Sequence, residues 1–302
     1  MKDIRFINDS KTTYINEVRV IDGNITHTVP VIRCAAYRDE KWISHGFSTR
    51  LGGVSAGIYG SLNLSFSHGD EEKLVRKNHG IMAAALGVKP DRLVYSHQTH
   101  TTNVLRVTEE HAGMGITRDR SFHDIDGFVT DVPGLMLVTA YADCVPLYFA
   151  DRRLHVIGLS HSGWRGTVNN MAQAAVDKLG SEFGSRPEDI IAFIGPSICA
   201  SCYEVGEDVA ENFFNAYGAE ADKVLKIKKE TEAGKKYYLN LHAANRINML
   251  NAGITEENIS VTDICTCCNP ELLFSHRASK GKRGGLCAYC LLYTSDAADD
   301  LT

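Results

Sequence analysis

The 302-residue sequence lacks a long hydrophobic run, an apolar leader and a strong excess of either charge. No apolar stretch reaches the ~18 residues that a membrane-spanning helix requires, so we expect no membrane partner. The first twenty residues contain several charged side chains and no apolar segment typical of secretory signals. A formal net charge of −5 argues against nucleic acid as the main partner, because phosphate binding requires a basic surface.

The sequence contains nine cysteines, an odd number, and shows no export signal. Because disulfides persist in oxidising compartments, we expect a cytoplasmic protein with free or metal-bound thiols. The composition, 44% hydrophobic and 23% charged, is that of a globular protein. A chain of this length buries roughly 75% of its unfolded surface and needs no disulfides for stability.

Apolar and β-branched runs alternate with helical patterns along the chain, which predicts an α/β or α+β fold with an extensive sheet system. No stretch has the composition of a linker, so we expect a single domain over residues 1–292. The predicted strands cover residues 31–37, 43–49, 93–95, 104–107, 135–141, 145–149, 155–161 and 190–194. The predicted helices cover residues 70–86, 167–180, 207–217 and 241–250.

The last ten residues, 293–302, read YTSDAADDLT and are small, acidic and aperiodic. Such a segment offers little apolar surface to a core, so we expect a disordered tail. It follows a Cys-rich apolar run at residues 286–292. We interpret this end of the chain as foreign to the native sequence.

The densest group of reactive side chains falls within residues 96–166, where polar residues follow predicted strands. The segments are SHQTH (96–100), DGFVTD (126–131), TAYADCVPLYFAD (139–151) and SHSGWRG (160–166). Within them, His100, Cys144 and His161 are candidate metal ligands. Two imidazoles and one thiolate suit Zn²⁺, and three protein ligands leave the fourth position for water that catalytic zinc requires. The alternative is that the histidines are ordinary polar residues and the cysteine fills a small space in the core.

The same residues also allow a mechanism without metal. Cys144 would then be a thiolate nucleophile and His161 its base, with Asp143 or another acid as the orienting group. This pattern is typical of a hydrolase that forms a covalent intermediate.

Two arginines are candidates for binding an anion. Arg50 lies in FSTRLGG (47–53), between a predicted strand and a Gly-rich turn, and Arg165 lies at the start of a predicted helix. A guanidinium beside helix N-terminal amides suits phosphate. The alternative is that both are surface arginines paired with carboxylates and that the two glycines only form a turn.

Three Cys-x-x-Cys pairs lie outside this region, at residues 199–202, 265–268 and 287–290. The second and third pairs are separated by eighteen residues, a spacing typical of a structural zinc ribbon. The third pair leads into the unusual tail, which weakens this prediction. The sequence indicates no partner for the first pair.

Taken together, the motifs resemble those of the YfiH family, also called the laccase-domain or multicopper polyphenol oxidase-like family. The resemblance extends from about residue 40 to residue 283. It rests on FSTRLGGVS (47–55), SLNL (61–64), GDEEKLVRKNH (69–79), QTHT (98–101), YADCVP (141–146), SHSGWRG (160–166), IGPSICASCYEVG (194–206) and LFSHR (273–277). The chain departs from the usual motifs at Thr101 (usually Gly), Ser162 (usually Ala) and Ser201 (usually Cys).

The resemblance implies an α/β sandwich in which mixed β-sheets are flanked by helices, with a zinc site formed by His100, Cys144 and His161. It also implies phosphorolysis of purine nucleosides, namely adenosine, inosine, guanosine and methylthioadenosine, and deamination of adenosine. Purine nucleosides and phosphate are therefore the expected substrates. Asp143 is the candidate proton carrier because it adjoins Cys144, and Arg50 and Arg165 are the candidates to bind phosphate.

The older family name implies copper chemistry, which the histidine pattern does not favour. A multicopper oxidase binds its copper mainly through closely spaced histidines. Among the twelve histidines, only His97 and His100 lie within five residues of each other, and no His-x-His occurs. Copper thus remains a minor alternative to zinc. The other functions that stay open are a metal-free Cys/His hydrolase acting on cell-wall peptide precursors, a copper-dependent polyphenol oxidase, and a metal-binding module without catalysis.

Overall fold

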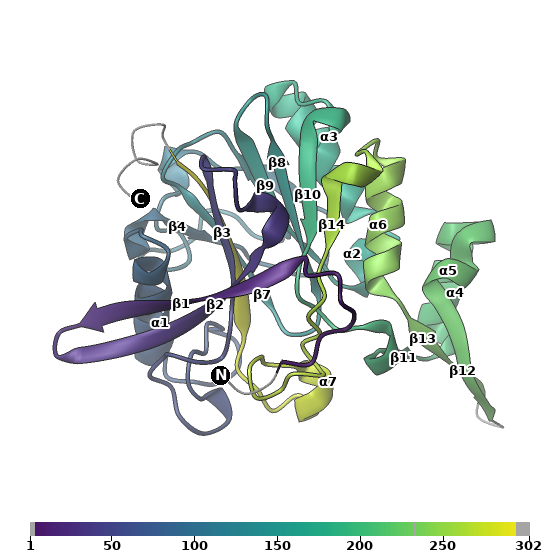
Figure 1. Cartoon of the computed structure of the whole chain (residues 1–302), viewed down its shortest axis with the longest axis horizontal. Coiled ribbons are helices and arrows are strands. Elements are labelled where there is room, and N and C mark those ends of the chain that lie inside the picture. The colour runs from purple at the N-terminus through teal and green to yellow at the C-terminus, as the bar shows by residue number, and fades with distance from the viewer. Residues whose placement is uncertain (1–3, 232–233, 294–302) are drawn as a thin grey trace.

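The computed structural model describes residues 4–231 and 234–293, and two six-stranded sheets form its centre (Figure 1). The first sheet has the order β1 (Thr13–Asp22), β2 (Ile25–Cys34), β3 (Ile43–Ser48), β15 (Leu286–Leu292), β7 (Met136–Tyr141) and β4 (Leu93–Tyr95). The second has the order β14 (Ile259–Val261), β10 (Ile190–Ile194), β8 (Val145–Asp151), β9 (Val156–Ser162), β6 (Gly127–Thr130) and β5 (Val104–Arg106). Both sheets mix parallel and antiparallel pairs.

Helices cover the outer faces of the two sheets. Helix α1 (Glu72–Ala85) packs on the first sheet, and α3 (Met171–Phe183) and α6 (Leu241–Asn251) pack on the second. A small third sheet of β11 (Glu204–Val205), β13 (Gly234–Leu239) and β12 (Leu225–Thr231) lies to one side with α4 (Glu207–Tyr217) and α5 (Ala221–Val224) (Figure 1). The short helices α2 (Trp164–Val168) and α7 (His276–Ser279) complete the set. The prediction of an α/β sandwich with mixed sheets flanked by helices is confirmed.

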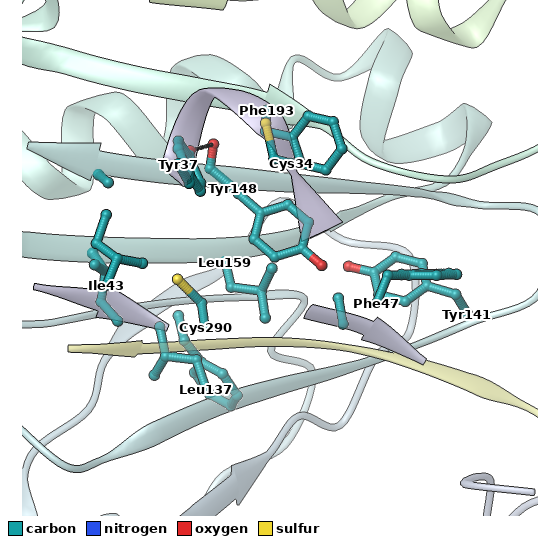
Figure 2. Packing of buried hydrophobic residues seen from close by; sticks show 14 of the residues in the cluster. Cys34, Tyr37, Ile43, Phe47, Leu137, Tyr141, Tyr148, Leu159, Phe193 and Cys290 are labelled. Carbon is teal, nitrogen blue, oxygen red and sulfur yellow. Dashed lines mark hydrogen bonds between the residues drawn. The ribbon is translucent and has the colours of Figure 1, made fainter. Parts of the chain in front are cut away.

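Buried aromatic and aliphatic side chains fill the space between the two sheets (Figure 2). Phe47 comes from the first sheet and Tyr148 and Phe193 from the second, and all three are at most 1% exposed. The Tyr148 hydroxyl donates a hydrogen bond of 3.0 Å to the carbonyl oxygen of Gly46 on the opposite sheet. Buried hydroxyl groups need such a partner, so this bond also fixes how the sheets face each other.

Strand β15 lies at the centre of the first sheet, between β3 and β7. All seven of its residues are buried. Cys290 faces the space between the sheets, whereas Tyr289 and Leu291 face α1. An apolar pattern on both faces is what a central strand requires, so the Cys-rich run that the sequence analysis set apart is part of the core. Tyr293, the first residue of the predicted disordered tail, donates its N–H to the carbonyl oxygen of Trp42 at 2.9 Å. The rest of that predicted tail, residues 294–302, lies outside the described residues.

The structure differs from the predicted elements at several points, including the helix at 167–180 and an N-terminal strand. The helix expected at 167–180 is two helices, α2 and α3, because Asn170 adopts a left-handed conformation with φ of 61°. Its side chain accepts the N–H of Gln173 at 3.2 Å and thereby caps α3. Strand β1 was not predicted at all; it pairs with β2 in an antiparallel hairpin at the edge of the first sheet, where many of its residues are exposed. Within the described residues, no helix has the length and hydropathy to cross a membrane.

Candidate metal and substrate site

Two loops and the end of a strand at the seam between the two sheets bring His100, Cys144 and His161 together. His100 follows β4, Cys144 lies in the bend that leads from β7 in the first sheet to β8 in the second, and His161 lies near the end of β9. The β8–β9 ladder pairs His161 with Pro146, two residues after the cysteine. The ligand atoms of the three side chains lie within 4.8 Å of one another. The two imidazole rings are 4.9 Å apart and nearly perpendicular.

The three side chains differ in exposure. His161 is 3% exposed, Cys144 is partly buried, and His100 is exposed to solvent. The donor set therefore consists of two nitrogens and one sulfur and is open on the side of His100. A three-ligand set with an open side fits a catalytic metal, whereas a structural zinc site is closed by four ligands.

Asp126, just before β6, organises two of the three candidate ligands. Its buried carboxylate accepts the Nδ1–H of His161 at 2.8 Å, which leaves Nε2 of that ring free to face Cys144. It also accepts the backbone N–H groups of Thr99, His100 and Thr101 at 2.9–3.1 Å. One carboxylate thus fixes both the loop that carries the first histidine and the orientation of the second. In the sequence, this residue is the first Asp of DGFVTD (126–131).

The electrostatics of the site favour an ionised thiol. Burial alone would raise the pKa of Cys144, but the facing imidazoles of His161 and His100 outweigh it and lower the pKa to about 6. Burial would lower the pKa of His161, but Cys144 and Asp126 outweigh it and raise the pKa to about 9. For Asp126, burial is outweighed by His161 and by backbone amides, which lower the pKa to about 2. A thiolate is the form that binds metal or acts as a nucleophile.

Gly163 of the GWRG segment makes room for the site. A Cβ atom at this position would lie 2.9 Å from Cδ2 of His100 and 3.1 Å from Sγ of Cys144. The backbone at the start of α2 therefore passes directly against both side chains. This close approach gives a physical reason for glycine in the motif.

Two cavities of about 380 and 420 Å³ meet at His100 and Cys144, and His161 lines the first of them. Polar and aromatic residues line the first, among them Ser65, Phe66, His68, Tyr95, Gln98 and Arg120. Apolar and aromatic residues line much of the second, among them Trp164, Ile198, Tyr203 and Leu241. Both cavities share His100, Ala142, Cys144 and Arg283. A substrate with one polar and one aromatic part could occupy both.

Arg283 is the cation that the sequence analysis missed. It lines both cavities, and its Nε is buried without a hydrogen-bond partner. Its Nη1 donates to the carbonyl of Gly284 at 3.0 Å. Burial lowers the pKa of the guanidinium, opposed by the charges of Asp143 and Cys144. A guanidinium that lines a cavity suits an anionic ligand.

Asp143 lies in the bend beside Cys144, with φ of 87°. One carboxylate oxygen accepts the hydroxyl of Thr266 at 2.6 Å and the other accepts the N–H of Arg277 at 2.7 Å. Asp143 lines the second cavity, and both of its carboxylate oxygens accept hydrogen bonds from the protein. The orienting acid of His161, however, is Asp126.

The two arginines predicted to bind phosphate have different surroundings. Arg50 donates to the carbonyls of Gly60 at 2.9 Å and Pro270 at 2.8 Å, and it lines neither cavity. Its guanidinium therefore holds loops together instead of facing the three side chains. Arg165 is exposed and lies 4.4 Å from the ring of Trp164, which lines the second cavity.

The spacing that suggested a zinc ribbon from the 265–268 and 287–290 pairs is misleading. Cys287 and Cys290 lie on opposite faces of β15, one toward α1 and the other between the sheets. They are both fully buried in apolar surroundings and cannot turn to a common ion. The structure instead brings the 265–268 pair against the 199–202 pair.

The fold and the site define an α/β sandwich protein with an open set of nitrogen and sulfur side chains that could hold a metal ion at the seam of its sheets. The family model described as multi-copper polyphenol oxidoreductase laccase matches residues 44–293. The chain belongs to this family, which agrees with the resemblance noted in the sequence.

Several relatives carry enzyme names. The chain is 34% identical over 256 residues to purine nucleoside phosphorylase YlmD of Bacillus subtilis, covering 83% of this chain and 89% of that protein. It is also 34% identical over 233 residues to adenosine deaminase RL5 of an unknown prokaryotic organism, covering 76% and 87%. The crystal structure of the Bacillus licheniformis hypothetical protein YfiH has a TM-score of 0.82 at 34% identity, covering 87% of this chain and 96% of that one.

Proposed function

We propose that the protein is a zinc-dependent enzyme that phosphorolyses purine nucleosides, including methylthioadenosine, and deaminates adenosine. The observation that carries this proposal is the open set of His100, Cys144 and His161 at the junction of two cavities. The names of the relatives supply the substrates, purine nucleosides and phosphate. We place the activity in the cytoplasm, because nine unpaired cysteines suit a reducing compartment.

The donor set allows zinc or a single copper ion, but not a cluster of several copper ions. Thiolate and imidazole ligands suit both metals. In the described part of the chain, however, only two groups of three or more side chains could hold an ion, and the second consists of cysteines alone. A cluster of several copper ions held by histidines therefore has no counterpart among these residues. When bound, Zn²⁺ supplies Lewis acidity that lowers the pKa of water to about 7.

The protein's own residues would orient the reactants. Asp126 holds the ring of His161 in one orientation and keeps its Nε2 aimed at Cys144. In deamination, Asp143 is the residue that we propose moves a proton to the leaving amine. It lines the second cavity and would exchange its hydrogen bond from Thr266 for one to substrate.

In phosphorolysis, we propose that Arg283 binds the phosphate. The aromatic side chains of Trp164 and Tyr203 in the second cavity suit a purine ring, while the polar side chains of the first cavity suit ribose and phosphate. Arg283 borders both and has a free buried donor. It would hold the phosphate against the ribosyl carbon as the bond to the base breaks. Arg165 remains a candidate at the rim of the second cavity.

Replacing Arg283 with Ala is expected to raise the KM for phosphate by roughly 10- to 100-fold, since hydrogen bonds to charged groups contribute about 1.5–3 kcal/mol. Deamination of adenosine needs no phosphate, so it should fall less than phosphorolysis of inosine. Initial rates at varied phosphate concentration measure both effects. Arg165→Ala, at an exposed position, is the comparison variant. If only Arg165→Ala raised the KM for phosphate, the phosphate site would instead lie at the start of α2.

Chromatography of nucleosides and bases tests the function directly. Purified protein should convert inosine to hypoxanthine only when phosphate is present, and adenosine to inosine without it. Chelation should abolish both reactions, and added Zn²⁺ should restore them. Full activity after removal of metal would refute the zinc mechanism. Oxidation of phenols with copper and no action on nucleosides would favour the oxidase alternative.

One observation favours a second candidate, the metal-free hydrolase. The imidazoles of His161 and His100 outweigh burial and lower the pKa of Cys144 to about 6, which suits a thiolate nucleophile. His161 faces this thiol as a base, and Asp126 accepts the Nδ1–H of His161 as the orienting acid. For that reaction, peptide precursors of the cell wall are the proposed substrates. Metal dependence distinguishes the two candidates.

A further inference from the structure

Two Cys-x-x-Cys pairs follow neighbouring strands of the second sheet. Strands β10 and β14 run parallel, with Phe193 paired to Ser260. A further bridge between Ser197 and Cys265 extends this pairing beyond the strand ends. Loops that leave parallel neighbours emerge at the same edge of a sheet. The topology therefore brings the 199–202 and 265–268 pairs together although they are distant in sequence.

The four sulfur atoms have the spacing of a metal-binding tetrahedron. All lie within 4.8 Å of one another, with 3.4 Å between Cys202 and Cys268 and 4.0 Å between Cys199 and Cys268. Zn–S bonds of ~2.3 Å in tetrahedral geometry correspond to S–S distances of ~3.8 Å. A disulfide bond would be ~2.0 Å long, so these thiols are not bonded to each other.

Backbone amides point at one of these sulfurs. The N–H groups of Cys199 and Cys268 donate to Sγ of Cys265 at 3.2 and 3.4 Å. A neutral thiol is a weak acceptor, whereas a thiolate ligand is a good one. Two amides directed at a single buried sulfur are therefore the arrangement that a ligating thiolate requires.

We propose that Cys199, Cys202, Cys265 and Cys268 bind a structural Zn²⁺ ion. Soft thiolate ligands in tetrahedral array favour zinc, and four of them close the coordination sphere. In contrast to the open site at Cys144, this site has no position for water or substrate. The inference stands independently of the proposed function, because it rests on a different set of residues.

The two cysteine loops also support the bend of the candidate active site. Thr266, within the second pair, donates its hydroxyl to Asp143 at 2.6 Å. Ile198, just before the first pair, donates its N–H to the carbonyl oxygen of Asp143 at 3.0 Å. An ion that joins the two loops thus fixes both contacts to the residue beside Cys144. Its role is to position that bend.

Metal analysis of the full-length protein, purified under reducing conditions, tests the site. Cys199→Ser is expected to lose about one zinc ion per chain, while the control Cys267→Ser, which removes a neighbouring thiol outside the set, keeps the wild-type content. His161→Ala separates the two sites, because it should lose metal only from the open site. If the proposed function fails, His161→Ala matches wild type while Cys199→Ser still loses its ion. Equal zinc in wild type and Cys199→Ser, or iron in place of zinc, would overturn the inference.

Alkylation of the wild-type protein covers the case in which Cys199→Ser does not fold. Cys202, Cys267 and Cys268 are all partly exposed, so burial alone predicts similar reaction with iodoacetamide. Zinc binding predicts that Cys202 and Cys268 react at least ~10-fold more slowly than Cys267 until a chelator removes the ion. Peptide mass spectrometry measures each position. Equal reaction before chelation, or disulfides among the four cysteines, would contradict the site.

Discussion

Cys144→Ala is expected to abolish action on nucleosides, whereas Cys144→Asp is expected to keep bound zinc and a measurable fraction of the rate. A carboxylate can replace the thiolate because it binds Zn²⁺ at ~2.0–2.2 Å, but a methyl group cannot. Loss of metal activation amounts to several kcal/mol, so we expect Cys144→Ala to lower kcat/KM by on the order of 10³-fold or more. Metal content and the rate of adenosine deamination, measured on the same samples, give the comparison.

The thiol-nucleophile mechanism predicts a different pattern for the same variants. A carboxylate cannot form the thioester of that mechanism, so Cys144→Asp and Cys144→Ala would be equally inactive. Cys267→Ser controls for the loss of a partly exposed thiol elsewhere and should be fully active. If metal-free protein turns over at the full rate and iodoacetamide on Cys144 stops it, the zinc mechanism is wrong.

Asp126→Asn is expected to weaken zinc binding at the open site by roughly 10- to 100-fold, the usual effect of losing the partner that orients a ligating histidine. The carboxylate accepts one N–H from His161 and several from the loop of His100. An amide offers a single accepting oxygen and turns its NH₂ group toward donors. Each buried donor left without an acceptor costs about 1–3 kcal/mol, so the melting temperature should also fall.

A competition titration with a chromophoric chelator measures the zinc affinity of Asp126→Asn. The matched control is Asp124→Asn, which alters an exposed carboxylate that accepts the Thr99 hydroxyl and lies 3.9 Å from Nδ1 of His97. Activity of Asp126→Asn should recover in part at high zinc concentration, since the first ligands remain. An unchanged affinity together with a lowered melting temperature would reduce Asp126 to a purely structural residue.

Much of the fold could be read from local patterns. Helix α1 lies within the range predicted from its apolar spacing, and β7 and β8 are buried strands, as their runs without polar interruption indicate. Strand β1 has no such pattern, because an edge strand keeps many polar, exposed residues. The break between α2 and α3 is also not visible in the apolar spacing of the sequence. Asn170 interrupts an otherwise continuous helical period with one left-handed residue.

The candidate site was predictable only where a residue type itself suggests chemistry. His100, Cys144 and His161 stand out as ligands at strand ends, and the structure brings them together. Asp126 stands out because its buried carboxylate accepts several hydrogen bonds, and Arg283 because its buried Nε has no hydrogen-bond partner. Neither property can be read from the neighbouring sequence.

The cysteine pairs show the same limit. Counting residues between them favours the wrong partners, because the order of strands in a sheet decides which loops meet.

The central position of β15 has a consequence for how the protein is made. Strands β3 and β7 each have β15 as a neighbour, and residues 286–292 leave the ribosome long after both. Until then, the edges of β3 and β7 that face β15 lack this partner, and such edges pair readily with other chains. The first sheet is therefore completed only when nearly all of the described chain has been synthesised. Nascent chains stopped before residue 286 should depend on chaperones to stay free of aggregates.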